Sequence, residues 1–371
     1  MTELDDQVYM ARAVQLARKG LYTTDPNPRV GCVLVKAGEI IGEGWHERAG
    51  DPHAEIIALN QAGRQARNAT AFVTLEPCCH AGRTGPCVEA MIEAGISRVV
   101  CSAIDPNPLV FGAGLRRLEE VGIIIETGLL EDAAASLNSG YLMRMRCGRP
   151  LVRSKLAVSL DGRTALASGE SQWITGEASR ADVHSWRARS SAVVTGIGTV
   201  LNDNPSLNAR LTDSSRDVLQ PLRIVIDSQL QTPPAATLID LPGDAIIFTK
   251  QSALQHAQNQ AQAQALSDKG VMIEGVSGDE QCNLEQVIQR LGEMEVNEVW
   301  VEAGAKLNGT LLEMGLVDEL VIYIAPHLLG ADSQGMFCIE PLASLKHRIQ
   351  VTYEDISRVG EDIRIIACLA E

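Results

Sequence analysis

Hydrophobic positions in the first 145 residues switch repeatedly between strand spacing and helix spacing. Short apolar or alternating runs predict strands, and apolar residues recurring every three to four positions predict helices. Because the two patterns alternate along the chain, they predict a three-layer α/β sandwich. The expected strands are residues 30–36, 39–43, 70–75, 97–102 and 123–126, and the expected helices are 7–19, 53–66, 87–94, 114–121 and 138–145.

The rest of the chain shows the same α/β alternation, and residues 146–150 are typical of a linker because they contain Gly148 and Pro150. We therefore expect domains at 1–148 and 149–371. Loops are expected at 168–175 and 201–210, and the last forty residues give no specific pattern. The expected strands are 151–159, 192–195, 222–226, 245–249, 298–301 and 319–325, and the expected helices are 177–189, 251–266 and one that ends at Met314.

The composition limits the classes of function. A chain of 371 residues suggests two domains of ordinary size. The formal net charge of -15 argues against a nucleic-acid partner, and an anionic small substrate would need a local basic pocket. The acidic start is unlike a signal peptide, and no apolar run reaches the length of a membrane span. The nine Cys show no secreted framework, so we expect a soluble cytoplasmic protein with no membrane partner.

The clearest chemistry lies between His53 and Cys87. The stretch begins with His-Ala-Glu and ends with three Cys, of which the last is separated from Cys78 by eight residues. A catalytic zinc ion takes three protein ligands and leaves the fourth position to water, whose pKa it lowers to about 7. A Glu two residues after the His can move the proton of that water. H-x-E followed by P-C and a later Cys is the signature of zinc deaminases.

Two other interpretations of this stretch remain open. Nucleic-acid deaminases end their motif with C-x-x-C, whereas here a longer loop with Gly and Pro must bring Cys87 back to Cys78. A structural zinc site would be closed by a fourth ligand, which Cys79 or His80 could supply. Three unrelated buried Cys are also conceivable, but they leave the His-Ala-Glu element unexplained.

The run TLEPCCHAGRTGPC at residues 74–87, with PNPRVGCV at 26–33 and GEGWH at 42–46, resembles the bifunctional deaminase/reductase family of riboflavin biosynthesis. The resemblance implies a cytidine-deaminase-like fold for the first domain. It also implies zinc as a cofactor. Cys79 stands where the family is expected to have serine, and it places a second thiol beside Cys78. By resemblance the zinc ligands are His53, Cys78 and Cys87, and Glu55 is the catalytic proton shuttle.

Two strand-to-glycine-to-helix junctions mark the second half, at residues 196–199 and 301–311. Such junctions can direct backbone N–H groups at a phosphate, although each could equally be a tight turn and neither is a full G-x-G-x-x-G. The runs KLAVSLDGRTA at 155–165, SGESQWIT at 168–175 and VEAG at 301–304 resemble the reductase half of the same family. The resemblance implies a dihydrofolate-reductase-like domain with NADPH as its cofactor.

The resemblance also assigns roles to individual residues. Arg side chains suit a phosphate group in an otherwise acidic protein, although each could instead form a surface salt bridge. Trp173 could be a packing residue, Asn27 an ordinary turn residue and His46 a solvated side chain. The expected NADPH contacts are Ala157, Trp173, Thr199, Asp203, Ser228, Gly304, Ala305, Lys306, Leu307, Asn308, Gly309 and Thr310. The expected substrate contacts are Ser171, Arg187, Leu207, Arg210 and Glu302, with Asn27, His46 and His80 at the pyrimidine, Arg83 at the substrate phosphate, and Lys155 and Asp161 at the sugar.

The resemblance implies two consecutive reactions. The first is zinc-dependent hydrolytic deamination of 2,5-diamino-6-(5-phosphoribosylamino)pyrimidin-4(3H)-one, and the second is reduction of its ribosyl group to ribityl by NADPH. We further expect a homo-oligomer, either a dimer or a tetramer. The alternatives are a deaminase for a free base, nucleoside or tRNA with a regulatory nucleotide-binding second half, and a zinc-stapled binding protein without activity.

Overall fold

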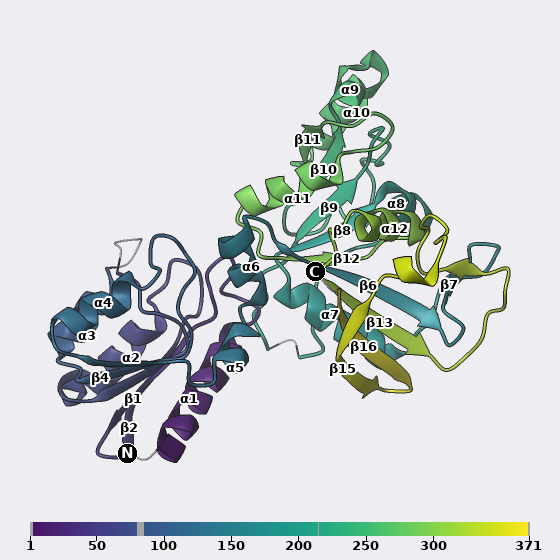
Figure 1. Ribbon diagram of the computed structural model, residues 1–371. Helices are drawn as coiled ribbons and strands as arrows, with labels where there is room; N and C mark the ends of the chain where they lie inside the picture. Colours follow the sequence, from purple (N-terminus) through teal and green to yellow (C-terminus); the bar gives the residue numbers. More distant parts are fainter. Residues whose placement is uncertain (1–2, 80–84, 214, 370–371) are drawn as a thin grey trace. The chain divides into compact units, whose positions relative to one another are not determined.

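The computed structural model of the chain describes residues 3–79, 85–213 and 215–369. It contains two compact units, Met1–Gly148 and Arg149–Glu371 (Figure 1). Helix α6 (Ser139–Cys147) ends the first unit at Gly148, whose positive φ of 71° is a left-handed conformation that glycine adopts without strain. Arg149 then begins the second unit with a two-pronged ion pair to Asp318. Within the described ranges, every helix falls short of the length and apolarity that crossing a bilayer requires.

The first unit is built on one five-stranded sheet with the order β2-β1-β3-β4-β5. Strand β1 is antiparallel to both of its neighbours, whereas β3, β4 and β5 run parallel. Parallel neighbours need a crossover, and helices α3 and α4 supply it. The strands are β1 (Gly31–Lys36), β2 (Glu39–Trp45), β3 (Thr70–Val73), β4 (Arg98–Cys101) and β5 (Ile124–Thr127).

Helices cover both faces of this sheet, so the unit has three layers. Alternate residues of a strand point to opposite faces, and β1 shows this clearly. Val33 and Val35 pack with α1 (Glu3–Ala17), whereas Cys32 and Leu34 pack with the other helices. These are α2 (Ala54–Ala62), α3 (Cys87–Ala94) and α4 (Ala113–Glu120), and α5 (Glu131–Ala135) packs beside α1.

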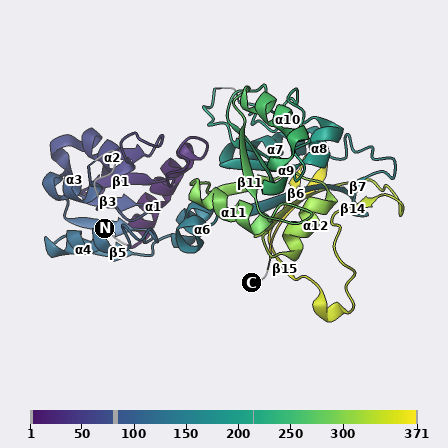
Figure 2. The same cartoon turned by 90° about the horizontal axis from the view of Figure 1, so that it is seen from above.

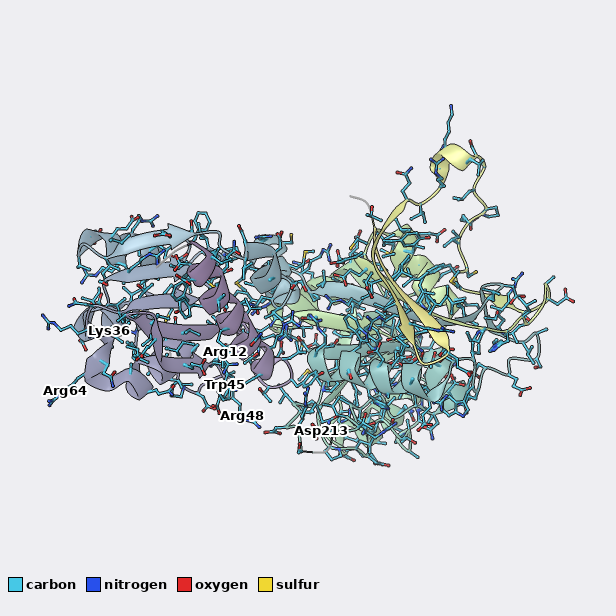
Figure 3. All side chains as sticks on the ribbon, turned by 90° about the horizontal axis from the view of Figure 1, so that it is seen from below. Arg12, Lys36, Trp45, Arg48, Arg64 and Asp213 are labelled. Carbon is cyan, nitrogen blue, oxygen red and sulfur yellow. The ribbon has the colours of Figure 1, made fainter. Side chains whose placement is uncertain are left out.

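Two close approaches fix the helices of the first unit to β2. A Cβ atom at Gly44 would lie 2.2 Å from the carbonyl oxygen of Ala54, so only glycine lets the start of α2 lie this close to the strand. On the other face, Arg12 of α1 pairs with Glu43 at 2.6 Å, and the Lys19 ammonium lies 4.1 Å from the centre of the Trp45 ring. Figure 3, in which Arg12 and Trp45 are labelled, shows both side chains at the surface. The Gly44 contact brings the first turn of α2 beside the end of β2.

The second unit is built on a nine-stranded sheet with the order β11-β10-β9-β8-β12-β6-β13-β16-β15 (Figure 1), and Figure 2 shows the same unit from above. The strands from β11 to β13 are parallel, and β16 and β15 add an antiparallel hairpin at one edge. The strands are β6 (Leu151–Ser159), β8 (Ala192–Gly196), β9 (Leu222–Ile226), β10 (Ala245–Lys250), β11 (Met272–Val276), β12 (Glu298–Val301), β13 (Glu319–Ala325), β15 (Val351–Val359) and β16 (Asp362–Leu369); β7 (Arg163–Ala165) and β14 (Gln334–Gly335) form a separate pair.

Helices also cover both faces of the large sheet. One face packs against α7 (Glu177–Arg189), α8 (Ile197–Asp203) and α10 (Ala257–Ser267), and the other packs against α11 (Leu284–Glu293) and α12 (Ala305–Glu313). Under α7, Trp186 stacks on Trp300 with their ring centres 5.3 Å apart. Beside them, the buried Arg153 of β6 pairs with Glu298 and Glu319 on the two neighbouring strands. Charges this deeply buried need such partners.

The C-terminal hairpin holds α7 at its N-terminus and along its length. The buried Asp362 carboxylate accepts hydrogen bonds from the backbone N–H of Gly176 at 2.8 Å and from the hydroxyl of Ser179 at 2.6 Å, as a helix cap does. Arg364 of the same hairpin and Tyr323 of β13 both donate to Asp182 on α7. The position of α7 therefore depends on the last residues of the described chain.

The structure differs from the sequence predictions in the bounds of several elements. Residues 197–203 form α8, so the loop predicted at 201–210 begins later. The helix predicted over 251–266 is interrupted at His256 and forms α9 (Gln251–Gln255) and α10. Helix α6 continues through Cys147, which shortens the predicted linker. The sequence analysis did not foresee α5, β7, β11, α11, β14, β15 or β16.

Replacing Asp362 by alanine should destabilise the second unit. The buried Ser179 hydroxyl and the N-terminus of α7 lose their acceptor, so we expect the free energy of unfolding to fall by about 1–3 kcal/mol in urea denaturation. Glu361→Ala, at the exposed neighbouring position, is the matched control and should change it by less than about 0.5 kcal/mol. Equal midpoints for the two variants would contradict the capping role.

Candidate functional site

One imidazole and two thiols converge in the first unit. The Nδ1 atom of His53 lies 3.2 Å from the sulfur of Cys87 and 3.5 Å from that of Cys78, and the three candidate ligand atoms all lie within 4.8 Å of one another. Tetrahedral zinc with bonds of 2.0–2.3 Å needs ligand atoms about 3.3–3.8 Å apart. Two thiols and an imidazole nitrogen at this separation fit a zinc ion, with a fourth position left over.

Three different elements bring these side chains together. His53 immediately precedes α2, Cys87 begins α3, and Cys78 follows the end of β3. The segment that carries Cys78 is held by Glu76, which is buried and accepts from the backbone N–H groups of residues 105, 112, 114 and 115. Sequence reasoning missed Glu76. Its only signal was a carboxylate inside an otherwise apolar strand end, which requires donors once it is buried.

The electrostatics of the site favour one thiolate and a carboxyl group that exchanges protons near neutrality. The hydrogen bond from Cys87, opposed by burial and helped by His53, lowers the pKa of Cys78 to about 4. The same hydrogen bond, with burial, raises the pKa of Cys87. Glu55 lies in the first turn of α2 and is only 3% exposed. Burial, followed by the nearby Cys78 charge, raises the pKa of Glu55 to about 7.

Asn27 and His46 form a polar pair beside His53. The Asn27 side-chain amide lies 3.0 Å from Nε2 of His46, and Nδ1 of His46 lies 3.2 Å from the carbonyl oxygen of Pro52. The amide nitrogen can only donate and the carbonyl can only accept. The pair therefore defines a neutral imidazole with its proton on Nδ1, and burial lowers the pKa of His46 accordingly. Its ring meets that of His53 edge-on, with the ring centres 5.2 Å apart.

Of the other candidates in the zinc loop, Cys79 lies within the described residues. The sulfur of Cys79 is 3.8 Å from the carbonyl oxygen of Leu109, and Cys79 does not belong to the group formed by His53, Cys78 and Cys87. This geometry favours Cys78 over its neighbour as the ligand. His80 and Arg83, which were expected at the substrate, lie outside the described residues.

In the second unit, the candidate cofactor residues lie at the carboxyl ends of parallel strands. Gly196 ends β8, Ser228 follows β9, and Gly304 follows β12. Ligands of open α/β sheets bind at this edge. A Cβ atom at Gly304 or at Gly198 would meet no heavy atom within 4 Å. The backbone at both junctions is therefore open to a ligand, as contact with a dinucleotide requires.

A buried ion pair joins two of the residues that are expected to contact the substrate. Arg187 of α7 donates two hydrogen bonds to the carboxylate of Glu302 and one to the carbonyl oxygen of Asn208. Trp300 donates to the same carboxylate at 2.9 Å. Burial opposes the ionised form, but the charge and hydrogen bonds of Arg187 lower the pKa of Glu302 to about 2. Burial lowers the pKa of Lys155, which faces both charges. The pair is not a solvated surface salt bridge, because the two side chains are only 11% and 14% exposed.

Arg210 is held next to this pair by a residue that sequence reasoning missed. His184 lies one helical turn before Arg187, and its ring nitrogens lie 3.2 Å from the backbone nitrogen and 3.1 Å from the guanidinium of Arg210. Burial, with the charges of Arg187 and Arg210, lowers the pKa of His184 to about 4. The i, i+3 spacing of His184 and Arg187 on one helix face was the signal that could have identified it.

Some residues that were predicted to contact the cofactor or the substrate are instead packed inside the second unit. The side chain of Leu207 is buried in the hydrophobic core, which leaves only its backbone, at a positive φ of 53°, for a ligand. Asn308 is buried and bonds to Ser154 and to the carbonyl oxygen of Ala303. A Cβ atom at Gly309 would lie 2.1 Å from the carbonyl oxygen of Cys338. At these three positions, the structure shows a packing role that the sequence did not predict.

The remaining predicted residues are accessible to different degrees. Trp173 is 70% exposed, with the Arg180 guanidinium 4.7 Å from its ring centre, so it is not a core residue. Asp161 accepts from Ser159 and from the backbone N–H groups of residues 329 and 330, and these bonds lower its pKa to about 2. Asp203, Lys306 and Thr310 are exposed, and Ala157, Ser171, Thr199, Ala305 and Leu307 are half-buried.

Two family models match the chain. Residues 150–365 match the RibD C-terminal domain, and residues 3–103 match the cytidine and deoxycytidylate deaminase zinc-binding region. The riboflavin biosynthesis protein RibD of Escherichia coli K12 is 46% identical over 369 residues, which cover 97% of this chain and 98% of that protein. The chain belongs to the RibD family.

Solved structures agree with this membership. RibD of Acinetobacter baumannii is 42% identical, with a TM-score of 0.90 over 99% of both chains. The Thermotoga maritima diaminohydroxyphosphoribosylaminopyrimidine deaminase/5-amino-6-(5-phosphoribosylamino)uracil reductase is 30% identical, with a TM-score of 0.85 over 99% of both chains. The predicted fold class, a deaminase domain followed by a reductase domain, is confirmed. The expected cofactors, zinc and NADPH, are those of the RibD family, and the donor set and the open glycine junctions fit them.

Two single serine variants test which thiols hold the metal. Cys78→Ser should reduce the zinc content of the purified protein from about one ion per chain to near zero, because a serine hydroxyl is not among the usual zinc ligands. Cys79→Ser is the matched control and should keep its zinc, because its sulfur lies outside the ligand group. Elemental analysis by mass spectrometry gives the result. Zinc loss in the Cys79 variant alone would reverse the ligand assignment.

Proposed function

We propose that the two units of the chain catalyse two consecutive steps of riboflavin biosynthesis. RibD proteins combine a deaminase with a reductase, and both activities follow from membership of the family. In this proposal the first unit deaminates 2,5-diamino-6-(5-phosphoribosylamino)pyrimidin-4(3H)-one, and the second reduces the ribosyl group of the product to ribityl. The convergence of His53, Cys78 and Cys87 beside the buried Glu55 is the observation that carries the assignment of the first site.

His53, Cys78 and Cys87 would hold the zinc ion of the first unit, and the bound ion would supply an activated water. Glu55 takes a proton from the attacking water on its carboxylate and delivers it to the departing exocyclic amine, so that ammonia leaves. A pKa of about 7 suits this work, since both protonation states of Glu55 are then populated near neutral pH. Asn27 and His46 hold the pyrimidine beside His53, with donors and acceptors fixed by their mutual hydrogen bond.

NADPH supplies the hydride in the second unit. Arg187 and Arg210 bind the phosphate of the open-chain sugar, because guanidinium groups match phosphate oxygens in pairs. Glu302 fixes the plane of the Arg187 guanidinium, and His184 fixes that of Arg210. Lys155, which faces Glu302 and Arg187, orients the sugar. The open junctions at Gly198 and Gly304 receive the cofactor phosphates.

A deaminase for a free base, a nucleoside or tRNA, with a regulatory second half, is the main alternative. The net charge of -15 argues against tRNA, and the basic group at 184–210 argues for a phosphorylated small substrate. The discriminating experiment measures ammonia release by the purified protein from the phosphoribosylated diaminopyrimidinone, from cytidine and from guanine. Release from cytidine or guanine in preference to the phosphoribosylated substrate would overturn the proposal.

The cellular setting of the protein belongs to the same proposal. Zinc thiolates need reduced Cys, and all nine Cys of the chain are free, so we place the protein in the cytoplasm. We also keep the expectation of a dimer or tetramer. Native mass spectrometry at the concentrations used for the assays measures the oligomeric state directly, and a monomeric mass would contradict it.

Glu55→Gln should abolish deamination while keeping zinc. The amide cannot carry the proton, so kcat should fall by about 100- to 10,000-fold, whereas the metal content should stay unchanged because Glu55 is not a ligand. Glu39→Gln, an exposed position on β2, is the matched control and should retain full activity. Loss of zinc from the Glu55 variant would show that the carboxylate has a structural role instead.

Arg187→Ala should weaken binding of the sugar phosphate more than binding of NADPH. Loss of a charge-assisted contact of 1.5–3 kcal/mol corresponds to a rise of about 10- to 150-fold in the dissociation constant. Because Arg187→Ala also leaves the buried Glu302 carboxylate without its partner, the variant Arg187→Lys, which keeps a positive charge, should be measured as well. Arg216→Ala, at an exposed arginine, is the control. Calorimetric titration with each ligand measures the two affinities. Equal losses for substrate and NADPH would contradict the assignment.

A further inference from the structure

The cofactor residues considered so far leave the choice between NADPH and NADH unexplained. The two cofactors differ only by a phosphate on the adenosine 2′-oxygen, so a preference for NADPH requires a donor or a cation at that point. Among the expected contacts only Lys306 is cationic, and it lies in the first turn of α12. That helix follows β12, and β12 is separated from β9 by β8. Lys306 therefore lies two strands away from β9 and from Ser228, so a cation that acts together with Ser228 has to come from another element.

Lys250 lies beside Ser228 at the carboxyl edge of the sheet. The parallel strands β9 and β10 pair Ile226 with Phe248, and the backbone N–H of Asp227 donates to the carbonyl oxygen of Phe248 at 2.9 Å. Ser228 and Lys250 each follow that last pair by two residues. Ser228 lies in the turn that follows β9, and Lys250 is the last residue of β10, so both lie at the carboxyl edge of neighbouring strands.

Lys250 carries a charge that no carboxylate balances. Its ammonium donates to the backbone carbonyl of Asp279 at 2.8 Å, and within the described part of the chain it forms no ion pair. Cys282 connects it to Ser228, since the Cys282 backbone N–H donates to the Ser228 hydroxyl at 3.0 Å. Burial raises the pKa of the Cys282 thiol, while the Ser228 hydrogen bond and the Lys250 charge oppose the rise. The segment 279–282 thus contacts both side chains, Lys250 through the carbonyl oxygen of residue 279 and Ser228 through the N–H of residue 282.

The acidic residue at this edge is not free to bind a ribose hydroxyl. In NAD-dependent Rossmann proteins a carboxylate near the end of the second strand accepts a hydrogen bond from the adenosine 2′-hydroxyl. Here Asp227 is fully buried and accepts from the backbone N–H and hydroxyl of Thr232, both at 2.7 Å, and from the backbone N–H of Gln229. Because Asp227 is bonded within its own turn, the polar groups left near this edge are the hydroxyl of Ser228, which is 9% exposed and bonded to residues 281 and 282, and the half-buried Lys250. A hydroxyl and an ammonium group suit a phosphate.

We propose that Lys250, together with the Ser228 hydroxyl, binds the adenosine 2′-phosphate of NADPH and so sets the preference over NADH. The inference rests on the proposed reductase function of the second unit. It adds a specificity-determining residue to that function, at a position that carries no other role in the reaction. The half-buried stem of Lys250 limits its motion, which holds the charge at the edge.

The test compares two fragments of the cofactor, 2′,5′-ADP and 5′-AMP, by calorimetric titration of the full chain. The wild type should bind 2′,5′-ADP more tightly. Lys250→Met keeps the apolar stem of the side chain. It should raise the dissociation constant of 2′,5′-ADP by about 10- to 100-fold and leave that of 5′-AMP unchanged. Lys250→Arg should keep most of the preference. Lys269→Met, a surface lysine paired with Asp240, is the matched control and should leave both affinities as they are.

Two results would overturn the inference: unchanged 2′,5′-ADP binding by Lys250→Met, or equal weakening of both fragments. A wild type that does not discriminate between the fragments would overturn it as well. Steady-state rates with NADPH and NADH provide the second readout, in which kcat/KM for NADPH should fall while that for NADH stays constant. Failure of the proposed function is a separate outcome, because the wild type would then oxidise neither cofactor in the presence of the deaminated substrate.

Discussion

The Glu302 carboxylate is a negative charge buried inside the second unit. The side chains that compensate this charge have to be held around it, and they include residues that are expected to contact the substrate. Two hydrogen bonds from Arg187 and one from Trp300 hold it. Breaking a buried pair on one side leaves an uncompensated charge, at a cost of about 3–5 kcal/mol. The partners therefore have to sit at fixed positions: Glu302 where β12 ends, Trp300 within the strand, and Arg187 on α7. Everything that fixes α7 is then part of the site, including the Asp362 cap that the distant C-terminal hairpin supplies.

The deaminase unit depends on a constraint of a different kind, namely the close approach between the backbone of β2 and the backbone at the start of α2. Only glycine at position 44 allows α2 to start against β2, and this contact puts His53 and Glu55 beside His46. The sequence indicated the candidate zinc ligands because they lie close together along the chain. Three candidate ligands and a carboxylate fall within 35 residues, and their spacing forms a motif that can be identified before any fold is known. It did not predict Glu76, whose donors come from residues 105 to 115 and become neighbours only when the chain folds.

The difference between features encoded in neighbouring residues and contacts made only on folding also explains which parts of the second unit could be predicted. Short buried parallel strands such as β9 and β12 are mostly apolar, and their predicted bounds agree with the structure. The hairpin of β15 and β16 lies at an edge, where β15 is largely exposed and mixes polar with apolar residues, so no clear alternation marks it. Leu207 and Asn308 show the same limit for site residues. A motif indicates that a position is near a ligand, whereas the direction of its side chain is decided by packing across the sheet.

The distribution of charge explains how so acidic a chain can bind two phosphorylated ligands. Glu302 cancels one of the three cations formed by Lys155, Arg187 and Arg210, and His184 stays neutral because burial and its cationic neighbours oppose its protonation. The group thus keeps an excess of positive charge around the buried pair of Arg187 and Glu302, with Arg210 on its exposed side. Interactions between charges are stronger there than in water, because the surroundings are less polar and screening by salt is weaker. The net charge of -15 therefore explains why the surface repels polyanions such as nucleic acid, whereas the local basic group determines that a phosphorylated small molecule can bind.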